Sequence, residues 1–334
     1  MFIGKIIDKV SDMLQIAFED SRNVRLLDRP DAPAIKETEI LGRTLVSLTS
    51  PGTELNWSAQ TSDFPFFPGY ASIVEAVAVG SAINDIAVGT LLYANGPHAQ
   101  SHVFRRDAVI PLPPDLSPEV AVFARLAVIS MTTLATTVVR PPSKVLITGL
   151  GPVGNLAAQV FQHCGYEVTA VDPVEARRDL ARQLGIRDTR ASIQNEAGQD
   201  LEGTLGLHVE CSGHEQAVLD GARLIRPRGE IVLLGVPWKK RTEIPAAELL
   251  HIIFHRYAVV RSGWEWEIPS QPQSFAGASI LQHANAALKW LAEGHLSVTG
   301  LADLYSPRDA ALVYDGLRTH SLPTPAALFD WRNI

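Results

Sequence analysis

The most informative chemical feature of the chain is a glycine-rich turn between an apolar run and a helix-forming run. Residues 144–148 are Lys-Val-Leu-Ile-Thr, and the next six residues have the spacing G-x-G-x-x-G. They are Gly149, Leu150, Gly151, Pro152, Val153 and Gly154. A strand that turns into a helix at such glycines presents free N–H groups and the positive end of the helix dipole, which together bind a pyrophosphate. The spacing predicts a dinucleotide site.

An acidic residue follows the second expected strand of this unit. Residues 167–171 are apolar or β-branched after Glu167, and Asp172 comes next, 172 − 149 = 23 residues after the first glycine. A carboxylate at this place accepts hydrogen bonds from the adenosine ribose and repels a 2′-phosphate, so NAD is predicted rather than NADP. Glycine-rich strand ends also occur as plain tight turns. Strand, glycines, helix, second strand and acid in register favour the nucleotide site.

The remaining pattern predicts an α/β chain of two domains. Beyond residue 126, apolar runs alternate with helical runs, which is typical of a doubly wound parallel sheet of the Rossmann type. Its strands are expected at 144–148, 167–171, 207–211, 230–234 and 257–262, and its helices at 155–163, 174–184 and 216–225. Earlier, short proline-punctuated strands at 45–49, 73–80, 89–94 and 103–110 predict an irregular, mostly antiparallel β domain.

The C-terminal tail is expected to return to the β-rich domain. It carries helix candidates at 281–293 and 307–318 and a last strand at 326–329. The predicted boundaries are therefore 1–125 with 266–334 for the β-rich domain, and 126–265 for the NAD-binding domain. Two domains also suit a length of 334 residues, which exceeds the usual size of one core.

Composition argues against several other classes of protein. The 29 basic and 36 acidic residues give a net charge of −7, which favours neither nucleic acid nor an anionic membrane as a partner. Cys164 and Cys211 are the only cysteines, so neither a disulfide framework nor a four-cysteine zinc site is possible, and a reducing cytoplasm is expected. Residues 1–10 carry charges unlike a secretory signal. The apolar run 120–139 is long enough for a membrane span, but we interpret it as a buried interdomain helix.

The order of the segments resembles the medium-chain dehydrogenase/reductase superfamily over nearly the whole chain. The similarity lies in a β-rich first domain, the turn at 149–154, Glu210-Cys211-Ser212-Gly213, and Leu233-Leu234-Gly235-Val236-Pro237. The resemblance implies a Rossmann domain with a GroES-like catalytic domain. It also implies cofactor contacts: Ser212, Gly213, Gly235, Val236 and Gly263 at the nicotinamide half, and Arg177 near the adenosine ribose. Gly235 and Gly263 are equally consistent with plain strand-end turns.

The resemblance breaks at the zinc ligands. Pro51 stands where the family has a cysteine, Tyr70 where it has a histidine, and Ala124 or Ala127 where it has a cysteine or glutamate. A catalytic zinc needs three N, S or O ligands and an open position, so no metal is predicted. His98 and His102 are four residues apart, but they fall in an expected loop-to-strand region and are interpreted as polar loop histidines.

Without zinc, another group must handle the proton that accompanies hydride transfer. Tyr70 is the first candidate because a phenol can donate to a carbonyl or accept from a hydroxyl, although it is almost as consistent with a side chain that fills the metal's space. Thr53 matches the family's proton-relaying hydroxyl. Glu54 is a candidate for anchoring a substrate hydroxyl or for pairing with a basic neighbour, and His98 is a further proton carrier. Trp57, Phe66 and Phe67 are expected to form an aromatic wall, with core packing favoured for the two phenylalanines.

The predicted function follows from these assignments. The segments Ser50–Glu54 and Pro68–Tyr70 resemble a zinc-lacking subgroup that includes bacteriochlorophyllide dehydrogenases and sugar or cyclitol oxidoreductases. We expect a cytoplasmic, zinc-independent NAD-dependent enzyme that interconverts a small-molecule secondary alcohol and a ketone. The alternatives are an NADPH-type quinone or enoyl reductase, and a non-catalytic NAD-binding protein. Pairing through the expected edge strand 257–263 predicts a homodimer.

Overall fold

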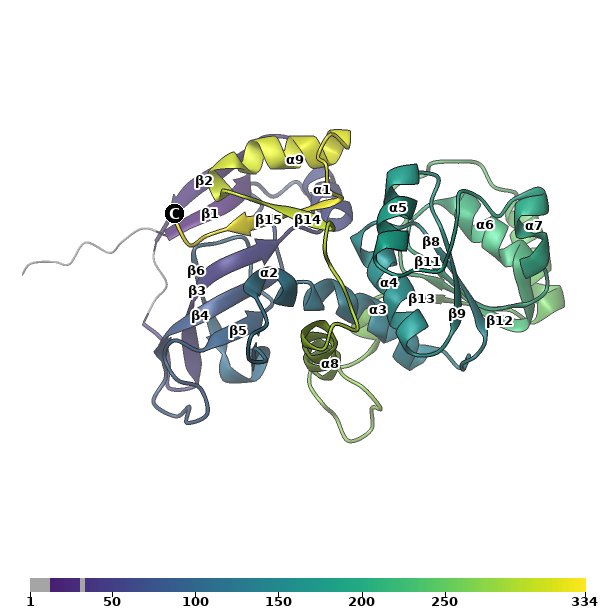
Figure 1. Cartoon of the computed structure of the whole chain (residues 1–334). Coiled ribbons are helices and arrows are strands. Elements are labelled where there is room, and N and C mark those ends of the chain that lie inside the picture. The colour runs from purple at the N-terminus through teal and green to yellow at the C-terminus, as the bar shows by residue number, and fades with distance from the viewer. Residues whose placement is uncertain (1–12, 31–33) are drawn as a thin grey trace, which may run out of the picture. The chain divides into compact units, whose positions relative to one another are not determined.

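The computed structural model describes residues 13–30 and 34–334, so the interpretation of residues 1–10 lies outside the described part. The chain divides into two compact units: residues up to Val122 with Ala302–Ile334, and Phe123–Leu301 (Figure 1). The sequence assigned 266–301 to the β-rich domain, but in the structure this stretch belongs to the second unit. The reason is that its helix α8 (Ile280–Ala292) packs against α3 (Ala124–Thr136) of the same unit.

The second unit contains the predicted doubly wound parallel sheet. Six strands lie in the order β10-β9-β8-β11-β12-β13, and all neighbouring pairs are parallel. Their bounds are β8 Lys144–Thr148, β9 Glu167–Val171, β10 Asp188–Arg190, β11 Leu205–Glu210, β12 Ile225–Leu233 and β13 Val259–Ser262. Its remaining helices are α4 Pro152–His163, α5 Glu175–Gln183, α6 Glu215–Leu224 and α7 Ala246–Arg256, with 3₁₀ helices over Asn195–Leu201 and Glu265–Glu267. The sequence did not predict β10 or α7.

Both faces of this sheet are covered, which explains its nearly continuous apolar strands. Val145 and Ile147 point to one face, where they share a core cluster with Ala157 and Phe161 of α4. The intervening Leu146 points to the other face and joins a second cluster with residues of α6 and α7. Figure 1 shows α4 and α5 beside one face and α6 and α7 beside the other. The strand ends of this sheet are therefore held in fixed positions.

The first unit is the β-rich, GroES-like domain that the sequence predicted. A seven-stranded sheet has the order β14-β15-β3-β4-β5-β7, with β6 also paired to β3, and a two-stranded sheet is formed by β1 and β2. The bounds are β1 Met13–Phe18, β2 Val24–Arg29, β3 Glu39–Leu48, β4 Ser72–Val79, β5 Leu91–Ala94, β6 Ser101–Arg105, β7 Val109–Pro111, β14 Ala302–Tyr305 and β15 Ala326–Asp330. The helices are α1 Pro51–Gln60, α2 Pro118–Ala121 and α9 Ala310–Thr319.

Two details of this unit differ from the sequence prediction. The strand expected at 103–110 is divided into β6 and β7, because residues Arg106–Ala108 form a 3₁₀ turn between them. Helix α1 was not expected at all. It starts at Pro51, and proline suits the first helical position because its missing N–H would have no partner there.

Most of the apolar run 120–139 is helical, as predicted, and the helix ends at Thr136. It forms α2 and α3, and the segment Pro118–Thr136 is long and apolar enough to cross a membrane by length and composition alone. However, 67% of its apolar window is buried within the structure, as in the core helix of a globular protein. In its own unit, α3 packs against α4 and α8.

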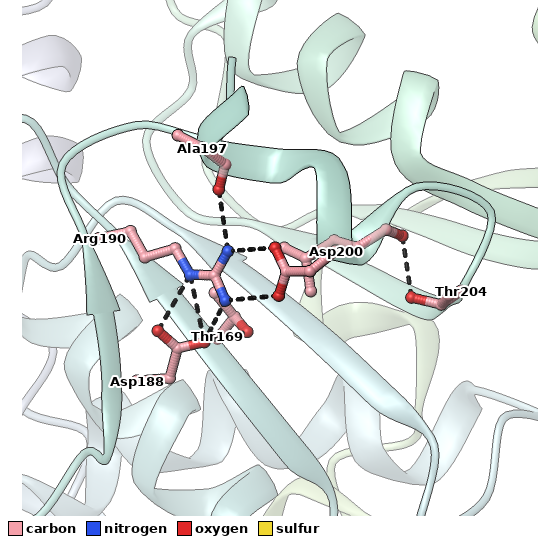
Figure 2. Close-up of polar contacts among 7 residues, drawn as sticks. Thr169, Asp188, Arg190, Ala197, Asp200 and Thr204 are labelled. Carbon is pink, nitrogen blue, oxygen red and sulfur yellow. Dashed lines mark hydrogen bonds and ion pairs between the residues drawn. The ribbon is translucent and has the colours of Figure 1, made fainter. Parts of the chain in front are cut away.

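An arginine at the edge of the parallel sheet fixes strand β10 (Figure 2). The guanidinium of Arg190 donates from Nε to Asp188 Oδ1 at 3.0 Å, and from Nη1 and Nη2 to the two carboxylate oxygens of Asp200 at 2.7 and 2.9 Å. These bonds to Asp200, and then those to Asp188, raise the pKa of Arg190. The backbone oxygen of Arg190 in turn accepts from the N–H of Asp172 at 3.2 Å. The network therefore fixes β10 next to Asp172, the residue predicted to bind the cofactor ribose.

A histidine is buried in the central strand β11. His208 has no exposed surface, and its Nε2 lies 2.9 Å from the hydroxyl oxygen of Thr148. Burial lowers the pKa of His208 to about 3, so the imidazole is neutral in the folded chain at ordinary pH. Because the unfolded chain takes up a proton near pH 6.5 and the folded chain does not, stability is lost as the pH falls from about 6.5 towards 3.

We expect a His208→Gln variant to lose this part of the pH dependence. Between pH 7 and pH 5 the free energy of unfolding of the unsubstituted chain should fall by about 2 kcal/mol more than that of the variant, as the linkage relation gives for one such histidine. Urea unfolding at both pH values measures this difference, with the exposed His251→Gln as a matched control. Parallel pH profiles for the chain and the His208 variant would contradict the assignment.

Candidate cofactor and catalytic sites

The glycine turn after β8 has the geometry that a pyrophosphate needs. Gly149 has a φ of +87°, which favours glycine, and a Cβ at Gly154 would lie only 1.7 Å from the carbonyl oxygen of Gly149. A Cβ at Gly151 would meet nothing within 4 Å, so space is open above the turn. Helix α4 starts at Pro152 with Gly151 as its N-cap and no side-chain cap. The backbone N–H groups at the N-terminus of α4 can therefore bind an anion such as the pyrophosphate of a dinucleotide.

Asp172 holds the glycine turn against the end of β9. Its carboxylate is 2% exposed, and its two oxygens accept from the N–H of Leu150 and of Val174, both at 2.8 Å. Arg177 Nη1 lies 3.4 Å from one of these oxygens, and Arg178 Nη1 donates to the backbone oxygen of Asp172 at 2.7 Å. Asp172 and Arg177 thus lie together beside the glycine turn.

A second carboxylate, which sequence reasoning missed as a site residue, organises the turn after β11. Glu210 Oε1 accepts from the N–H of Ser212 at 2.7 Å and also from its hydroxyl, and Oε2 accepts from the N–H of Gly213 at 2.9 Å. Burial raises the pKa of Glu210, while the bonds from Ser212 and Gly213 act in the opposite direction. Glu210 stands two residues before Ser212 and three before Gly213, and this spacing is the sequence pattern that could have predicted the turn.

The turns that follow β8, β11 and β12 lie so close together that a side chain at their glycines would clash. A Cβ at Gly149 would lie 2.9 Å from the Cβ of Ser212, and one at Gly235 would lie 2.4 Å from the nitrogen of Gly213. Gly263, after β13, packs equally closely on Leu234, whose Cα would be 2.9 Å from an added Cβ. Gly235 and Gly263 are thus required by packing at the strand ends. Val236 follows Gly235 and is 46% exposed at this edge.

The four catalytic candidates lie in the first unit. Thr53 and Glu54 are neighbours on α1, Thr53 half-buried and Glu54 without exposed surface. His98 is also completely buried, in the loop between β5 and β6. Because neither Glu54 nor His98 has an exposed atom, they are positioned to support other residues rather than to contact a substrate.

Glu54 and His98 belong to one buried hydrogen-bond network. Trp331 Nε1 donates to Ser47 Oγ at 2.9 Å, and this oxygen lies 2.7 Å from His98 Nδ1. A carboxylate can only accept, so His98 carries its hydrogen on Nε2, towards Glu54, and in the neutral ring Nδ1 then accepts the hydrogen of Ser47. That Nε2 lies 3.2 Å from Glu54 Oε2, which also accepts from the hydroxyl of Tyr314.

This network closes around the start of α1. Glu54 Oε1 accepts from the N–H of Ser50 at 2.8 Å, which fixes the residue before the helix. Burial first, and Glu54 second, raise the pKa of the Tyr314 phenol well above its usual value, so it stays a hydrogen donor. The basic neighbour considered for Glu54 in the sequence is therefore His98.

Tyr70 lies next to this network and belongs to a partly exposed aromatic surface. Gly69 has a φ of +99°, and a Cβ there would lie 2.5 Å from the backbone nitrogen of His98, so the chain passes directly over His98. The half-buried ring of Tyr70 lies 6.0 Å from that of Trp57, and Trp57 lies 6.4 Å from Phe66. Of the three residues expected to form an aromatic wall, Trp57 and Phe66 lie together, with Tyr70 beside Trp57. Phe67 instead lies beneath the guanidinium of Arg29, 4.6 Å away.

The residues at the family's zinc-ligand positions do not fit a zinc ion. Pro51, Ala124 and Ala127 carry no donor atom, so Tyr70 is the one side chain at these positions with an atom that could bind a metal. Within residues 13–30 and 34–334 there is also no group of three or more His, Cys, Asp or Glu residues that could hold a metal ion. The side chains at these positions therefore cannot supply the three ligands that a catalytic zinc needs.

Comparison with known proteins adds a family match and a fold match. Residues 152–267 match the family described as Zinc-binding dehydrogenase. The L-threonine 3-dehydrogenase of Aliivibrio salmonicida (strain LFI1238) is 28% identical over 220 residues, which cover 54% of this chain. The chain spans 63% of the length of that relative.

Solved structures share the fold over almost the whole chain. Galactitol-1-phosphate dehydrogenase from Escherichia coli has a TM-score of 0.81 at 19% identity, covering 95% of this chain and 100% of that one. A putative zinc-binding dehydrogenase from Sinorhizobium meliloti 1021, bound to NADP, has a TM-score of 0.77 at 19% identity and covers 96% and 99%.

A Rossmann unit with a strand-end nucleotide turn and a GroES-like unit is the architecture of alcohol-dehydrogenase-like proteins. Together with the family match over residues 152–267, it supports assignment to the medium-chain dehydrogenase/reductase superfamily.

The buried network predicts a large difference between two substitutions of Glu54. Glu54→Ala leaves buried donors on His98, Tyr314 and Ser50 without their acceptor, and should lower the free energy of unfolding by about 3–5 kcal/mol. Glu54→Gln keeps an acceptor oxygen and should cost clearly less. Denaturant unfolding measures both variants, with the exposed Glu37→Ala as control. If Glu54→Ala were no more destabilising than Glu37→Ala, the network would not have the structural role assigned to it.

Proposed function

We propose that the protein is a zinc-independent, NAD(H)-dependent oxidoreductase that interconverts a secondary alcohol, such as a sugar or cyclitol, and a ketone. The observation that chiefly supports this is the uncapped N-terminus of α4 beside Gly151, where a Cβ would meet nothing within 4 Å. Assignment to a superfamily of dehydrogenases and reductases supports the reaction class.

The proposed cofactor contacts come from the ends of five strands, β8, β9, β11, β12 and β13. Backbone N–H groups of Val153 and Gly154 bind the pyrophosphate, and Asp172 with Arg177 binds the adenosine ribose. Ser212, Gly213, Val236 and the strand-end glycines contact the nicotinamide half. Bound NAD would supply a carbon that accepts or returns a hydride.

NAD is proposed over NADP because of the charge of Asp172. Its carboxylate lies at the end of β9, where it would repel a 2′-phosphate. Arg177, 3.4 Å from that carboxylate, neutralises part of this charge, and a structural neighbour binds NADP. The preference is therefore best measured directly with both nucleotides.

The proposed chemistry of the first unit rests on two hydroxyl groups. Tyr70 donates its phenolic hydrogen to a substrate carbonyl, or accepts a hydrogen bond from a substrate hydroxyl, and Thr53 relays the proton to solvent. Glu54 and His98 act as positioning residues, because they fix the start of α1 and the backbone at Gly69. Trp57 provides an aromatic face to the substrate.

A Tyr70→Phe variant tests this assignment. We expect turnover of secondary polyols or of their ketones with NAD(H), unchanged by a chelator. In the variant, kcat should fall by at least about 100-fold, as expected for the loss of a general acid or base, while the Kd for NADH stays the same. Tyr305→Phe, a half-buried tyrosine on β14, is the matched control.

Other outcomes of this assay would each contradict part of the proposal. Activity that disappears with a chelator and returns with zinc would refute zinc independence. Preference for NADPH with quinones or enones would favour a quinone or enoyl reductase. Tight NADH binding without turnover of any alcohol, ketone, enone or quinone would indicate a non-catalytic NAD-binding protein.

We also propose that the protein forms a cytoplasmic homodimer through β13. This strand ends the order of the parallel sheet, and Val259 and Val260 on it are 47% and 37% exposed. An apolar open edge favours pairing with a second copy. The cytoplasmic location is proposed because both cysteines, Cys164 and Cys211, are free.

Charges on β13 should dissociate this dimer. We expect light scattering to give twice the monomer mass for the unsubstituted chain and the monomer mass for Val259→Lys combined with Val260→Lys, since paired edges would bring like charges together. Val88→Lys, at a 66% exposed position of the first unit, should remain dimeric. A monomeric unsubstituted chain, or a dimeric double variant, would contradict the proposed interface.

A further inference from the structure

Helix α7 presents two histidines on its exposed side. The helix packs against β12 and α6, and Ile252 is its buried residue. His251 and His255 are both exposed and four residues apart, so they are neighbours on one helical face. Their ring centroids are 3.9 Å apart, with an angle of 33° between the ring planes. The two imidazoles are therefore already next to each other.

The backbone orients one of these rings. His255 Nδ1 lies 2.9 Å from the carbonyl oxygen of His251. Because a carbonyl can only accept, Nδ1 carries the hydrogen and donates it, which leaves the lone pair on Nε2. Histidines that bind metal ions commonly make this bond through their other ring nitrogen, since it fixes the tautomer and raises the basicity of the ligand.

The charged groups around this face are engaged elsewhere. Glu248, one turn before His251, is held by Arg223, with Nε to Oε1 at 2.7 Å and Nη2 to Oε2 at 3.0 Å. The guanidinium of Arg256, next to His255, donates to the backbone oxygen of Ile225. Neither arginine is thus directed at the histidine pair, and the nearby carboxylate is neutralised. The donors that remain are two imidazole nitrogens.

We propose that His251 and His255 form a binding site for one divalent transition-metal cation, with water at its remaining positions. Imidazole ligands suit Cu²⁺, Ni²⁺ and Zn²⁺, whereas Mg²⁺ and Ca²⁺ prefer oxygen. Two ligands held on one helix chelate the ion without further ordering of the backbone. The site is separate from the residues assigned to the cofactor and to catalysis, and it does not depend on the proposed function.

The site has a consequence for the question of a catalytic zinc. Metal bound at α7 would appear in the purified protein at up to one ion per chain without a role in turnover. Metal content alone therefore cannot distinguish a zinc-dependent enzyme from a zinc-independent one. A variant without the histidine pair makes that distinction, because it should lose the metal and keep its activity.

Calorimetric titration of the untagged full chain with Ni²⁺, and separately with Zn²⁺, tests the proposal. We expect one ion per chain, and at least about a tenfold loss of affinity in His251→Ala or His255→Ala, since loss of a metal's supporting hydrogen bond alone costs about 10–100-fold. The double variant should not bind, and Mg²⁺ should not bind to any form. Binding should weaken as the solution is acidified, because protons compete with the metal ion for histidine ligands.

Two controls keep the result specific. His214→Ala and His320→Ala, at histidines outside α7, should bind the ion as the unsubstituted chain does. The melting temperature and NADH binding of the double variant should match those of the unsubstituted chain, which shows that the fold is kept. Absence of binding to the unsubstituted chain, or an affinity unchanged in the double variant, would overturn the proposal.

Discussion

The close approach of three backbone turns at the carboxyl edge of the parallel sheet is the constraint on which the cofactor site depends. Gly149, Gly154 and Gly235 lie so near to their neighbours that a Cβ at any of them would be within 3 Å of another atom. Two buried carboxylates, Asp172 and Glu210, hold these turns through backbone N–H groups. Sheet, helix and acids together leave the α4 N-terminus open to an anion. The nucleotide site is thus a product of backbone packing.

The GroES-like unit uses a buried carboxylate for a different purpose. Glu54 connects α1 to His98 and to Tyr314 of α9, which lies 260 residues further along the chain. Such a network is stable only while every polar atom has its partner. It fixes the segments that carry Thr53 and Tyr70. In the function we propose, this packing replaces the order that a zinc site imposes in related enzymes.

Local sequence patterns predicted some features well, for physical reasons. The apolar runs of β8, β9 and β11 are buried on both faces, so their composition indicates strands, and the glycine spacing indicates the turn that follows. Helix α1 was missed because Pro51 and Gly52 suggest a turn, although proline also suits a helix start. Strand β10 has only three residues, and its place depends on the distant Asp200.

The candidate sites also divide into residues that local sequence patterns predict and residues whose place depends on tertiary contacts. Gly149, Gly151 and Asp172 are recognisable from spacing, since their geometry is local. Glu54 and His98 carry polar side chains that suggest exposure, and only the tertiary contacts with Tyr314 and Ser47 bury them. The boundary near 266 was misplaced because α8 resembles other amphipathic helices, and its packing against α3 is not visible in its own sequence.

The central claim is that the turn after β8 binds a nicotinamide dinucleotide, and calorimetry with NADH tests it most directly. We predict that the unsubstituted chain binds one NADH, that Gly154→Ala abolishes binding because the added Cβ would lie 1.7 Å from the Gly149 oxygen, and that Gly277→Ala, with open space around it, binds normally. Failure of the unsubstituted chain to bind NADH or NADPH, or equal binding by the Gly154 variant, would contradict the claim.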